Sequence, residues 1–115
     1  MSENRREFFR VIFDRTISGE VSIYGKNLPI KIDNVSVGGL EFNSPIDIPM
    51  HQKVECSFNI LEVSFSIDAS IVRKATKNTY FAYGVVFDID QETSSLLFKQ
   101  LNFYQIRQRK GNNLV

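Results

Sequence analysis

The chain has 115 residues, of which 43% are apolar, and its formal net charge is +1. This length predicts one domain, residues 1–115, with enough apolar residues for a single hydrophobic core. The near-neutral charge excludes a strong overall field that would draw the protein to nucleic acid or to an anionic membrane. An anion site in this chain must therefore be a local cluster of basic side chains.

Cysteine content and hydropathy bear on the cellular compartment. Cys56 is the only cysteine, which excludes an internal disulfide framework. The first residues lack the continuous apolar stretch of a signal peptide, and no segment approaches the roughly 18 apolar residues of a membrane span. We therefore expect a cytoplasmic protein without a membrane span.

The first half of the chain contains short segments with the composition of β-strands. Gly25, the Gly38-Gly39 pair and Pro45 separate them and predict turns. The predicted strands are residues 9–15, 19–24, 28–33 and 40–42.

The next two segments show strict alternation of apolar and polar residues. Residues 53–60 and 63–71 both have this period of two, which predicts strands with one face in the core and one in water. Only Leu61 and Glu62 separate them, so we expect a tight hairpin, with a register that no Asn-Gly dipeptide fixes. Residues 80–87 are apolar on both faces, which favours a strand between the barrel interior and a covering helix.

Residues 90–110 have a helical pattern. Asp88 or Asp90 can cap the start, and basic residues gather before Gly111, as the helix dipole favours. Apolar residues recur at the spacing of one helix face: Leu97, Leu101 and Tyr104. Five to seven strands followed by one helix predict a mainly β protein, a closed or nearly closed barrel that the helix caps or flanks.

A cluster of arginines near the N-terminus is the first candidate for a binding site. Arg6 and Arg10 are four residues apart, and Arg5 stands beside the first. Guanidinium groups bind phosphates with two hydrogen bonds and also stack on purine rings. A basic N-terminal run is more often a solvated tail, so this cluster alone is a weak indication.

The second candidate is the turn at residues 34–39, directly after a predicted strand. Asn34 and Ser36 carry short polar side chains that bind turn backbone or the edge of a ligand. Gly38 and Gly39 allow positive φ and close approach of the backbone. Ordinary turns use the same residues, so this pattern too is unspecific when it stands alone.

Together, the two clusters resemble the signature of the PilZ domain family. The RxxxR motif of the family corresponds to Arg6 and Arg10, and its [DN]xSxxG motif to Asn34, Ser36 and Gly39. Residues 38–42 are similar to the GGxxF continuation of that motif, and residues 83–87 to a late strand often written GVxF. The resemblance runs from about Arg5 to the C-terminal helix, and it departs from the commoner pattern only where Asn34 replaces Asp.

This resemblance implies a six-stranded antiparallel β-barrel with a C-terminal helix that binds cyclic di-GMP (c-di-GMP) on its outer surface. Residues 1–10 would form a flexible segment that clamps the ligand. Within it, Arg6 and Arg10 would contact phosphates and stack on guanine. Family members bind one ligand or a stacked pair, and Arg5 is expected to reach the second guanine.

On the barrel face, Asn34 and Ser36 would donate to or accept from the base or phosphate, and Gly39, beside Gly38, would let the backbone approach the ligand. The resemblance thus implies a non-enzymatic receptor without a cofactor that changes conformation on binding c-di-GMP and signals to an unidentified protein partner. Two alternatives stay open: a PilZ-like adaptor that works through protein contacts without nucleotide, and a single-strand nucleic-acid binder, which the near-neutral charge disfavours.

Other chemically capable residues have simpler roles. His51 is the only histidine, so a metal site is not expected, and Cys56 fits the core pattern of its strand. The sequence lacks the GxSxG, P-loop and GxGxxG motifs. Arg73 and Lys74 are interpreted as a solvated strand end, although they can add positive potential near a ligand.

Overall fold

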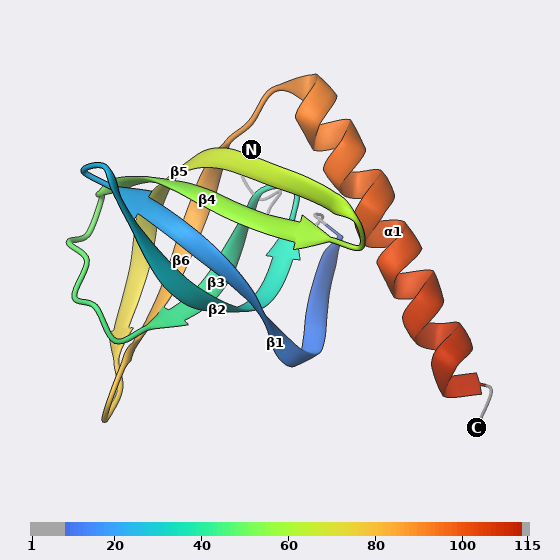
Figure 1. The fold of residues 1–115 in the computed structure, drawn as a ribbon, viewed down its shortest axis with the longest axis horizontal. Coiled ribbons are helices and arrows are strands. Elements are labelled where there is room, and N and C mark those ends of the chain that lie inside the picture. Colours follow the sequence, from blue (N-terminus) through green and yellow to red (C-terminus); the bar gives the residue numbers. More distant parts are fainter. Residues whose placement is uncertain (1–8, 114–115) are drawn as a thin grey trace, which may run out of the picture.

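The computed structural model describes residues 9–113, which form a barrel of six antiparallel strands and one helix (Figure 1). Around the closed barrel the strands follow the order β1-β2-β3-β6-β5-β4. This architecture confirms the predicted six-stranded barrel with a C-terminal helix. The elements are β1 (Arg10–Ile23), β2 (Lys26–Ser36), β3 (Gly39–Ser44), β4 (Lys53–Ile60), β5 (Val63–Thr76), β6 (Phe81–Asp88) and α1 (Gln91–Asn113).

Strand β1 replaces two of the predicted strands. The sequence predicted a break at residues 16–18, but the strand continues, with an irregularity in its pairing to β2 between Ile12 and Ile17. Gly19, within this strand, permits close packing: a Cβ atom there would lie 2.7 Å from Cδ1 of Ile32 and 2.8 Å from the carbonyl oxygen of Ser57. The glycine thus lets β1 approach β4 and close the barrel.

The hairpin between β4 and β5 is as tight as predicted. Ile60 pairs with Val63, so only Leu61 and Glu62 form the turn. Leu61 has a φ of 57°, a left-handed conformation that two-residue hairpin turns require. The strict alternation of this region is therefore reproduced with its apolar residues inward, including the buried Cys56.

The barrel interior is filled by aliphatic and aromatic side chains from all six strands. Phe58 stacks on Phe65 and on Phe87, with ring centroids 5.5 Å and 6.3 Å apart. Full burial of side chains of this size contributes roughly 1.5–3 kcal/mol each. The interior is therefore a packed core, and the outer surface of the barrel remains as the place for a ligand.

Helix α1 lies along one end of the barrel, against β4 and β2 (Figure 1). Leu97 and Leu101 are fully buried, and Tyr104 packs edge-on against Phe13 of β1 with centroids 5.2 Å apart. The expectation that the helix covers β6 is wrong, since Val86 on the outer face of β6 is 40% exposed. This valine instead lines a small hollow on the outer surface of the barrel.

The helix begins one residue later than predicted and ends three residues later, at Asn113. Asp90, not Asp88, caps it: its Oδ1 accepts a hydrogen bond of 2.7 Å from the backbone N–H of Thr93. This bond lowers the pKa of Asp90. Within the described part of the chain, no helix is long and apolar enough to cross a membrane.

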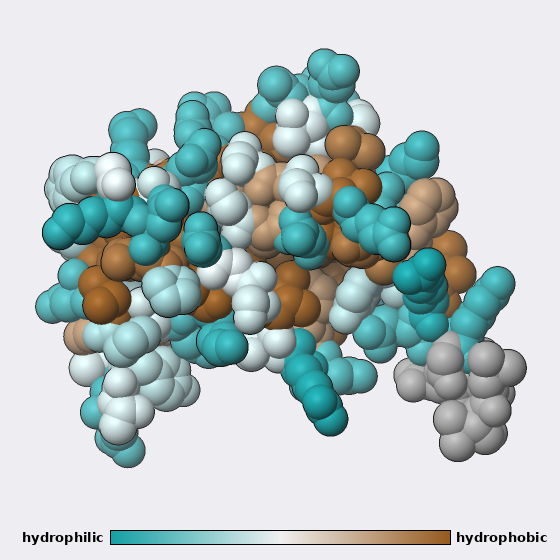
Figure 2. All heavy atoms as spheres, in the orientation of Figure 1, coloured by the Kyte–Doolittle hydropathy of each residue, from teal (hydrophilic) through white to brown (hydrophobic). Residues whose placement is uncertain are grey.

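Exposed apolar side chains form separate patches among polar ones on the face that Figure 2 shows, including along the helix. Four large apolar residues of α1 are between 41% and 47% exposed: Leu96, Phe98, Phe103 and Ile106. The helix thus uses one side to close the end of the barrel and leaves other apolar side chains partly in solvent.

Candidate anion-binding site

Irregular strand pairing places the side chains of Asn34 and Arg73 on the same outer face of the barrel. Ile30 and Ile32 point inward, so strict alternation would also place Asn34 in the core. A register shift between Ile32 and Asn34 moves Val35 inward instead and leaves Asn34 outward. A second shift, between Ile71 and Arg73, does the same for Arg73 in β5. Bulges of this kind commonly redirect side chains at functional sites.

Arg10 joins this face because it pairs with Ser36 at the start of β1. Its Nη1 donates a hydrogen bond to Oδ1 of Asn34, and its Nη2 donates to Oγ of Ser36 at 3.3 Å. The sequence placed Arg10 at the end of a flexible segment, but strand pairing and these two bonds hold it. Arg10 thus covers two polar side chains that are themselves only 8% and 0% exposed.

Ser36 also organises the turn that follows. Its Oγ accepts a hydrogen bond of 3.1 Å from the backbone N–H of Gly38 and donates to the carbonyl oxygen of Gly39 at 3.4 Å. The carbonyl of Gly38 in turn accepts from the N–H of Phe87 at 2.9 Å. The Ser36 hydroxyl therefore connects Arg10 to the turn, and the carbonyl of Gly38 connects the turn to β6.

Gly39 permits close approach between two strands. A Cβ atom there would lie 2.0 Å from the carbonyl oxygen of Val85, a distance that no side chain tolerates. Its φ is not in the left-handed region. The backbone that comes close to Gly39 is thus that of β6, whereas the sequence had led us to expect the backbone to approach a ligand.

Glu41 and Arg73 extend the polar cluster beyond the residues predicted. Register places Asn34, Glu41, Gly84 and Arg73 side by side across β2, β3, β6 and β5. Nδ2 of Asn34 donates to Oε1 of Glu41 at 2.9 Å, and Oε2 of Glu41 forms an ion pair with Nη2 of Arg73. Hydrogen bonds and this ion pair thus run continuously from Arg10 to Arg73.

Burial and the neighbouring charges shift the pKa of Arg10 in opposite directions. Partial burial lowers the pKa of the Arg10 guanidinium most, nearby Glu41 raises it, and nearby Arg73 lowers it again. Guanidinium remains charged at all physiological pH values because its ordinary pKa exceeds 12. Two permanent cations therefore share one carboxylate.

A small hollow of about 60 Å³ lies between the two arginines. Glycines form part of its lining, and Val72 and Val86, which are 41% and 40% exposed, provide apolar surface. Its size suits part of a ligand resting on the barrel surface. The complete lining is Arg10, Gly38, Gly39, Val72, Arg73, Gly84, Val85 and Val86. Two arginines beside apolar side chains can bind a phosphate and also contact an attached base.

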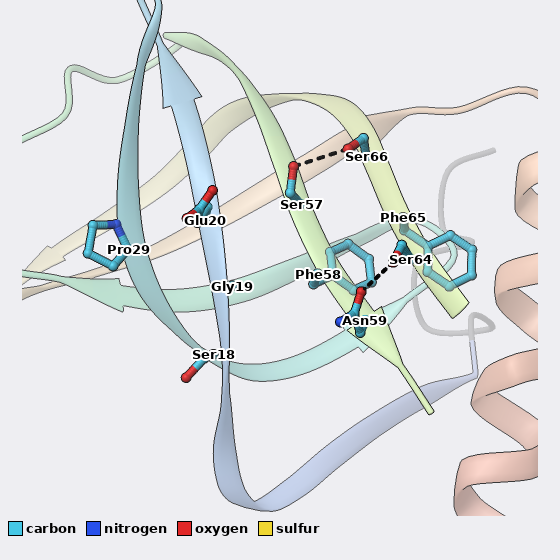
Figure 3. Close-up of a pocket in the computed structure, with 10 residues that line it drawn as sticks. All are labelled: Ser18, Gly19, Glu20, Pro29, Ser57, Phe58, Asn59, Ser64, Phe65 and Ser66. Atoms are coloured by element: carbon cyan, nitrogen blue, oxygen red, sulfur yellow. Dashed lines mark hydrogen bonds between the residues drawn. The ribbon is translucent and has the colours of Figure 1, made fainter. Parts of the chain in front are cut away.

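A larger hollow of about 460 Å³ lies elsewhere on the barrel, over β1, β4 and β5 (Figure 3). There Ser57 and Ser66 point toward each other with their hydroxyls 3.1 Å apart, and Ser64 donates to Asn59 at 2.8 Å. Its single charged lining residue is Glu20. Because a carboxylate repels phosphate, this hollow is the weaker candidate for an anion site.

The structure brings together Arg10, Asn34, Ser36, Gly38 and Gly39 of the predicted residues, while Arg5 and Arg6 lie outside the described residues. No group of three metal-ligating side chains occurs in residues 9–110. Burial raises the pKa of the Cys56 thiol to about 12, which agrees with a core residue.

Sequence reasoning missed Glu41, Val72 and Val86, and it interpreted Arg73 as a solvated strand end. The alternation that stops after Ile71 was a signal for Arg73, because an interrupted period of two is typical of a bulge. Nothing comparable marked Glu41, which fits an ordinary outward position in β3.

Residues 4–103 match the family model described as the PilZ domain. This match covers most of the chain, which therefore belongs to the PilZ domain family. No match was found among the curated proteins.

Several solved structures share this fold at low sequence identity. The PilZ domain of YcgR from Escherichia coli, solved with c-di-GMP, is 15% identical, with a TM-score of 0.73 over 96% of this chain and 99% of that one. Longer YcgR in complex with c-di-GMP is 14% identical, with a TM-score of 0.73 over 95% of this chain and 49% of YcgR. The inhibitor of motility MotI/DgrA from Bacillus subtilis is 14% identical, with a TM-score of 0.72 over 91% of this chain and 53% of MotI/DgrA. Our chain thus spans about half the length of the two longer proteins.

Proposed function

We propose that this protein is a cytoplasmic, non-enzymatic receptor for c-di-GMP. The observation that carries the proposal is the cluster of Arg10, Asn34 and Ser36, joined by hydrogen bonds on the outer face of the barrel beside the hollow. Two structures with this fold, YcgR and its PilZ domain, are complexes with c-di-GMP.

The geometry supports separate roles for the residues of the site: some bind phosphate and others contact guanine. Arg10 is held in place, so its guanidinium is oriented for a phosphate before the ligand arrives, which lowers the entropy lost on binding. Val72 and Val86 offer an apolar surface for a guanine ring. Arg6 would close over the ligand from the N-terminal side, and Arg5 would reach a second guanine if two ligands stack.

A path for signalling leads from the site to helix α1. Phe9, directly before Arg10, packs edge-on against Phe98 of the helix with centroids 6.0 Å apart. Closure of the preceding residues over a ligand would act on this contact and thereby on α1. Exposed apolar side chains of the helix, including Phe103 and Ile106, would then present a changed surface to a protein partner.

Isothermal titration calorimetry with c-di-GMP tests the proposal and gives the stoichiometry. We expect the wild-type protein to bind, and Arg10→Ala to lose at least about tenfold in affinity, because each charge-assisted hydrogen bond to phosphate is strong. Arg15→Ala is the matched control, since Arg15 is an exposed arginine of the same strand. Absence of binding by the wild-type protein would refute the receptor function, and equal loss in both variants would place the ligand elsewhere.

Two further measurements address the finer parts of the proposal. A stoichiometry of two that falls to one in Arg5→Ala would support the stacked pair. Ligand-induced changes in the NMR amide shifts of α1 that vanish in Phe98→Ala, while binding persists, would support the signalling path. Capture of a partner that responds neither to c-di-GMP nor to Arg10→Ala would favour the adaptor alternative instead.

A further inference from the structure

Glu41 occupies an unexpected place for an acidic residue. It lies between Arg10 and Arg73, the two cations that line the hollow, and its side chain is 39% exposed. A carboxylate beside an anion site repels the phosphate that the site would bind. The strand alternation that turns Glu41 outward does not account for a negative charge at this position.

Gly84 explains how Arg73 reaches Glu41 across an intervening strand. A Cβ atom on Gly84 would lie 2.9 Å from Nη2 and 3.0 Å from Cζ of Arg73, so the guanidinium lies over this glycine. With any side chain at position 84, the side chain of Arg73 would have to move away from the barrel surface. The ion pair therefore depends on a strand position that carries no side chain.

Arg73 is nevertheless free enough to change partner. Its side chain is 60% exposed, and it already lines the hollow beside Arg10. Exposed ion pairs contribute little net free energy, because water competes for both groups. A ligand phosphate in the hollow would thus compete with Glu41 for the guanidinium of Arg73.

We propose that Glu41 is an internal counter-ion that holds Arg73 in the free protein, and that Arg73 moves from Glu41 to a phosphate of c-di-GMP when the ligand binds. In this role Glu41 keeps Arg73 oriented in the free protein but weakens the affinity for the ligand. It thereby sets the concentration at which the receptor responds. This inference rests on the proposed function and adds two residues to the predicted site.

Glu41→Gln separates the charge of this residue from its contact with Asn34. Glutamine keeps an Oε1 acceptor for Nδ2 of Asn34, but it loses the negative charge and replaces the Oε2 acceptor of the Arg73 ion pair by an NH2 donor. We expect this variant to bind c-di-GMP about twofold to fivefold more tightly in calorimetry, since an exposed ion pair no longer has to break. Glu20→Gln makes the same change in net charge in the serine-lined hollow and should leave the affinity unchanged.

Arg73→Ala tests the second half of the exchange. If Arg73 moves to the ligand, removing it weakens binding, whereas unchanged affinity would mean that Arg73 stays with Glu41 and would overturn the proposal. Thermal unfolding of each variant shows whether the barrel stays intact. If Glu41→Gln were to unfold, Glu41→Met, which also lacks the charge, provides the second variant.

Salt dependence distinguishes a counter-ion from a merely structural residue. The affinity difference between the wild-type protein and Glu41→Gln should shrink as ionic strength rises, because salt screens exposed charges. A difference that does not change with salt, or weaker binding by Glu41→Gln, would show that Glu41 only positions Asn34. Failure of the wild-type protein to bind would refute the receptor function itself, whereas wild-type binding with an unaltered Glu41→Gln affinity would refute this inference alone.

Discussion

Tyr83 of β6 accepts a hydrogen bond of 2.7 Å from the backbone N–H of Ile48, although 35 residues separate them. The same hydroxyl donates to the carbonyl oxygen of Ile46 at 2.6 Å. Tyr83 and Ile48 are 2% and 1% exposed. One phenol thus satisfies two backbone groups in the segment between β3 and β4, where no strand pairing is available.

Tyr83→Phe should therefore destabilise the protein. The ring would keep its stacking on Phe42, but a buried N–H group would lose its partner, which costs about 1–3 kcal/mol in the free energy of unfolding. Urea unfolding measures this as a lower midpoint with an unchanged slope. Tyr80→Phe, at a residue that is 39% exposed, is the control and should change the midpoint little; equal effects would contradict the role assigned to the Tyr83 hydroxyl.

Gly39→Ala and Gly84→Ala should differ sharply in their effect on folding. The new methyl group at position 39 would meet the backbone carbonyl of Val85 at 2.0 Å, so β3 and β6 would have to separate. At position 84 it would meet mainly the flexible side chain of Arg73, which can move into solvent. We expect Gly39→Ala to lower the melting temperature by many degrees and Gly84→Ala by few, as circular dichroism would show. The reverse order would contradict the close approach at Gly39.

The strands were predictable wherever alternation was strict. The alternation of residues 53–60 and 63–71 correctly predicted β4 and most of β5, because a sustained period of two is typical of a strand with one buried face. The predicted break at residues 16–18 was wrong, because β1 continues through them with irregular pairing to β2 between Ile12 and Ile17. Local sequence does not distinguish such an irregularity from a break, because the pairing depends on the strand opposite.

The site was predictable only in part, for a related reason. The motif identified Arg10, Asn34 and Ser36, and β1–β2 pairing brings the three together. The approach of Arg73 to Glu41 depends on the register shift between Ile71 and Arg73, and a one-residue slip moves a side chain to the opposite face of a sheet. The alternation that stops after Ile71 indicates a bulge, but it does not fix the register of Arg73 against β6. The ion pair between Arg73 and Glu41 was therefore found only in the structure.

Asp90→Ala should weaken the start of helix α1. Its carboxylate accepts the backbone N–H of Thr93, and this bond lowers the pKa of Asp90. A lowered pKa means that the contribution to stability is present above the ordinary value of 3.8 and is lost as pH falls through the lower folded value. The melting temperature of Asp90→Ala should thus lie below that of the wild-type protein at pH 7 and approach it in acid. Asp88→Ala is the control; a similar loss there would show that Asp88 shares the capping role.

Cys56 should react only when the barrel unfolds, because its side chain is fully buried and burial raises the pKa of its thiol from 9.0 to about 12. A chromogenic disulfide reagent at pH 8 should modify the thiol in urea and leave it unmodified in the native protein. Since the folded pKa is raised, the neutral thiol stabilises the fold fully below pH 9, and this contribution is lost as pH rises from 9 toward 12.

Cys56→Ala provides the comparison for this pH dependence. Lysine and tyrosine side chains titrate in both proteins, so their effects cancel in the difference. The stability advantage of the wild-type protein over Cys56→Ala should therefore shrink by roughly 1.4 kcal/mol for each pH unit above 9. Urea unfolding at pH 8, 9 and 10 measures that difference. A constant difference over this range, or rapid modification of the native thiol at pH 8, would mean that Cys56 is not enclosed in the core of the barrel.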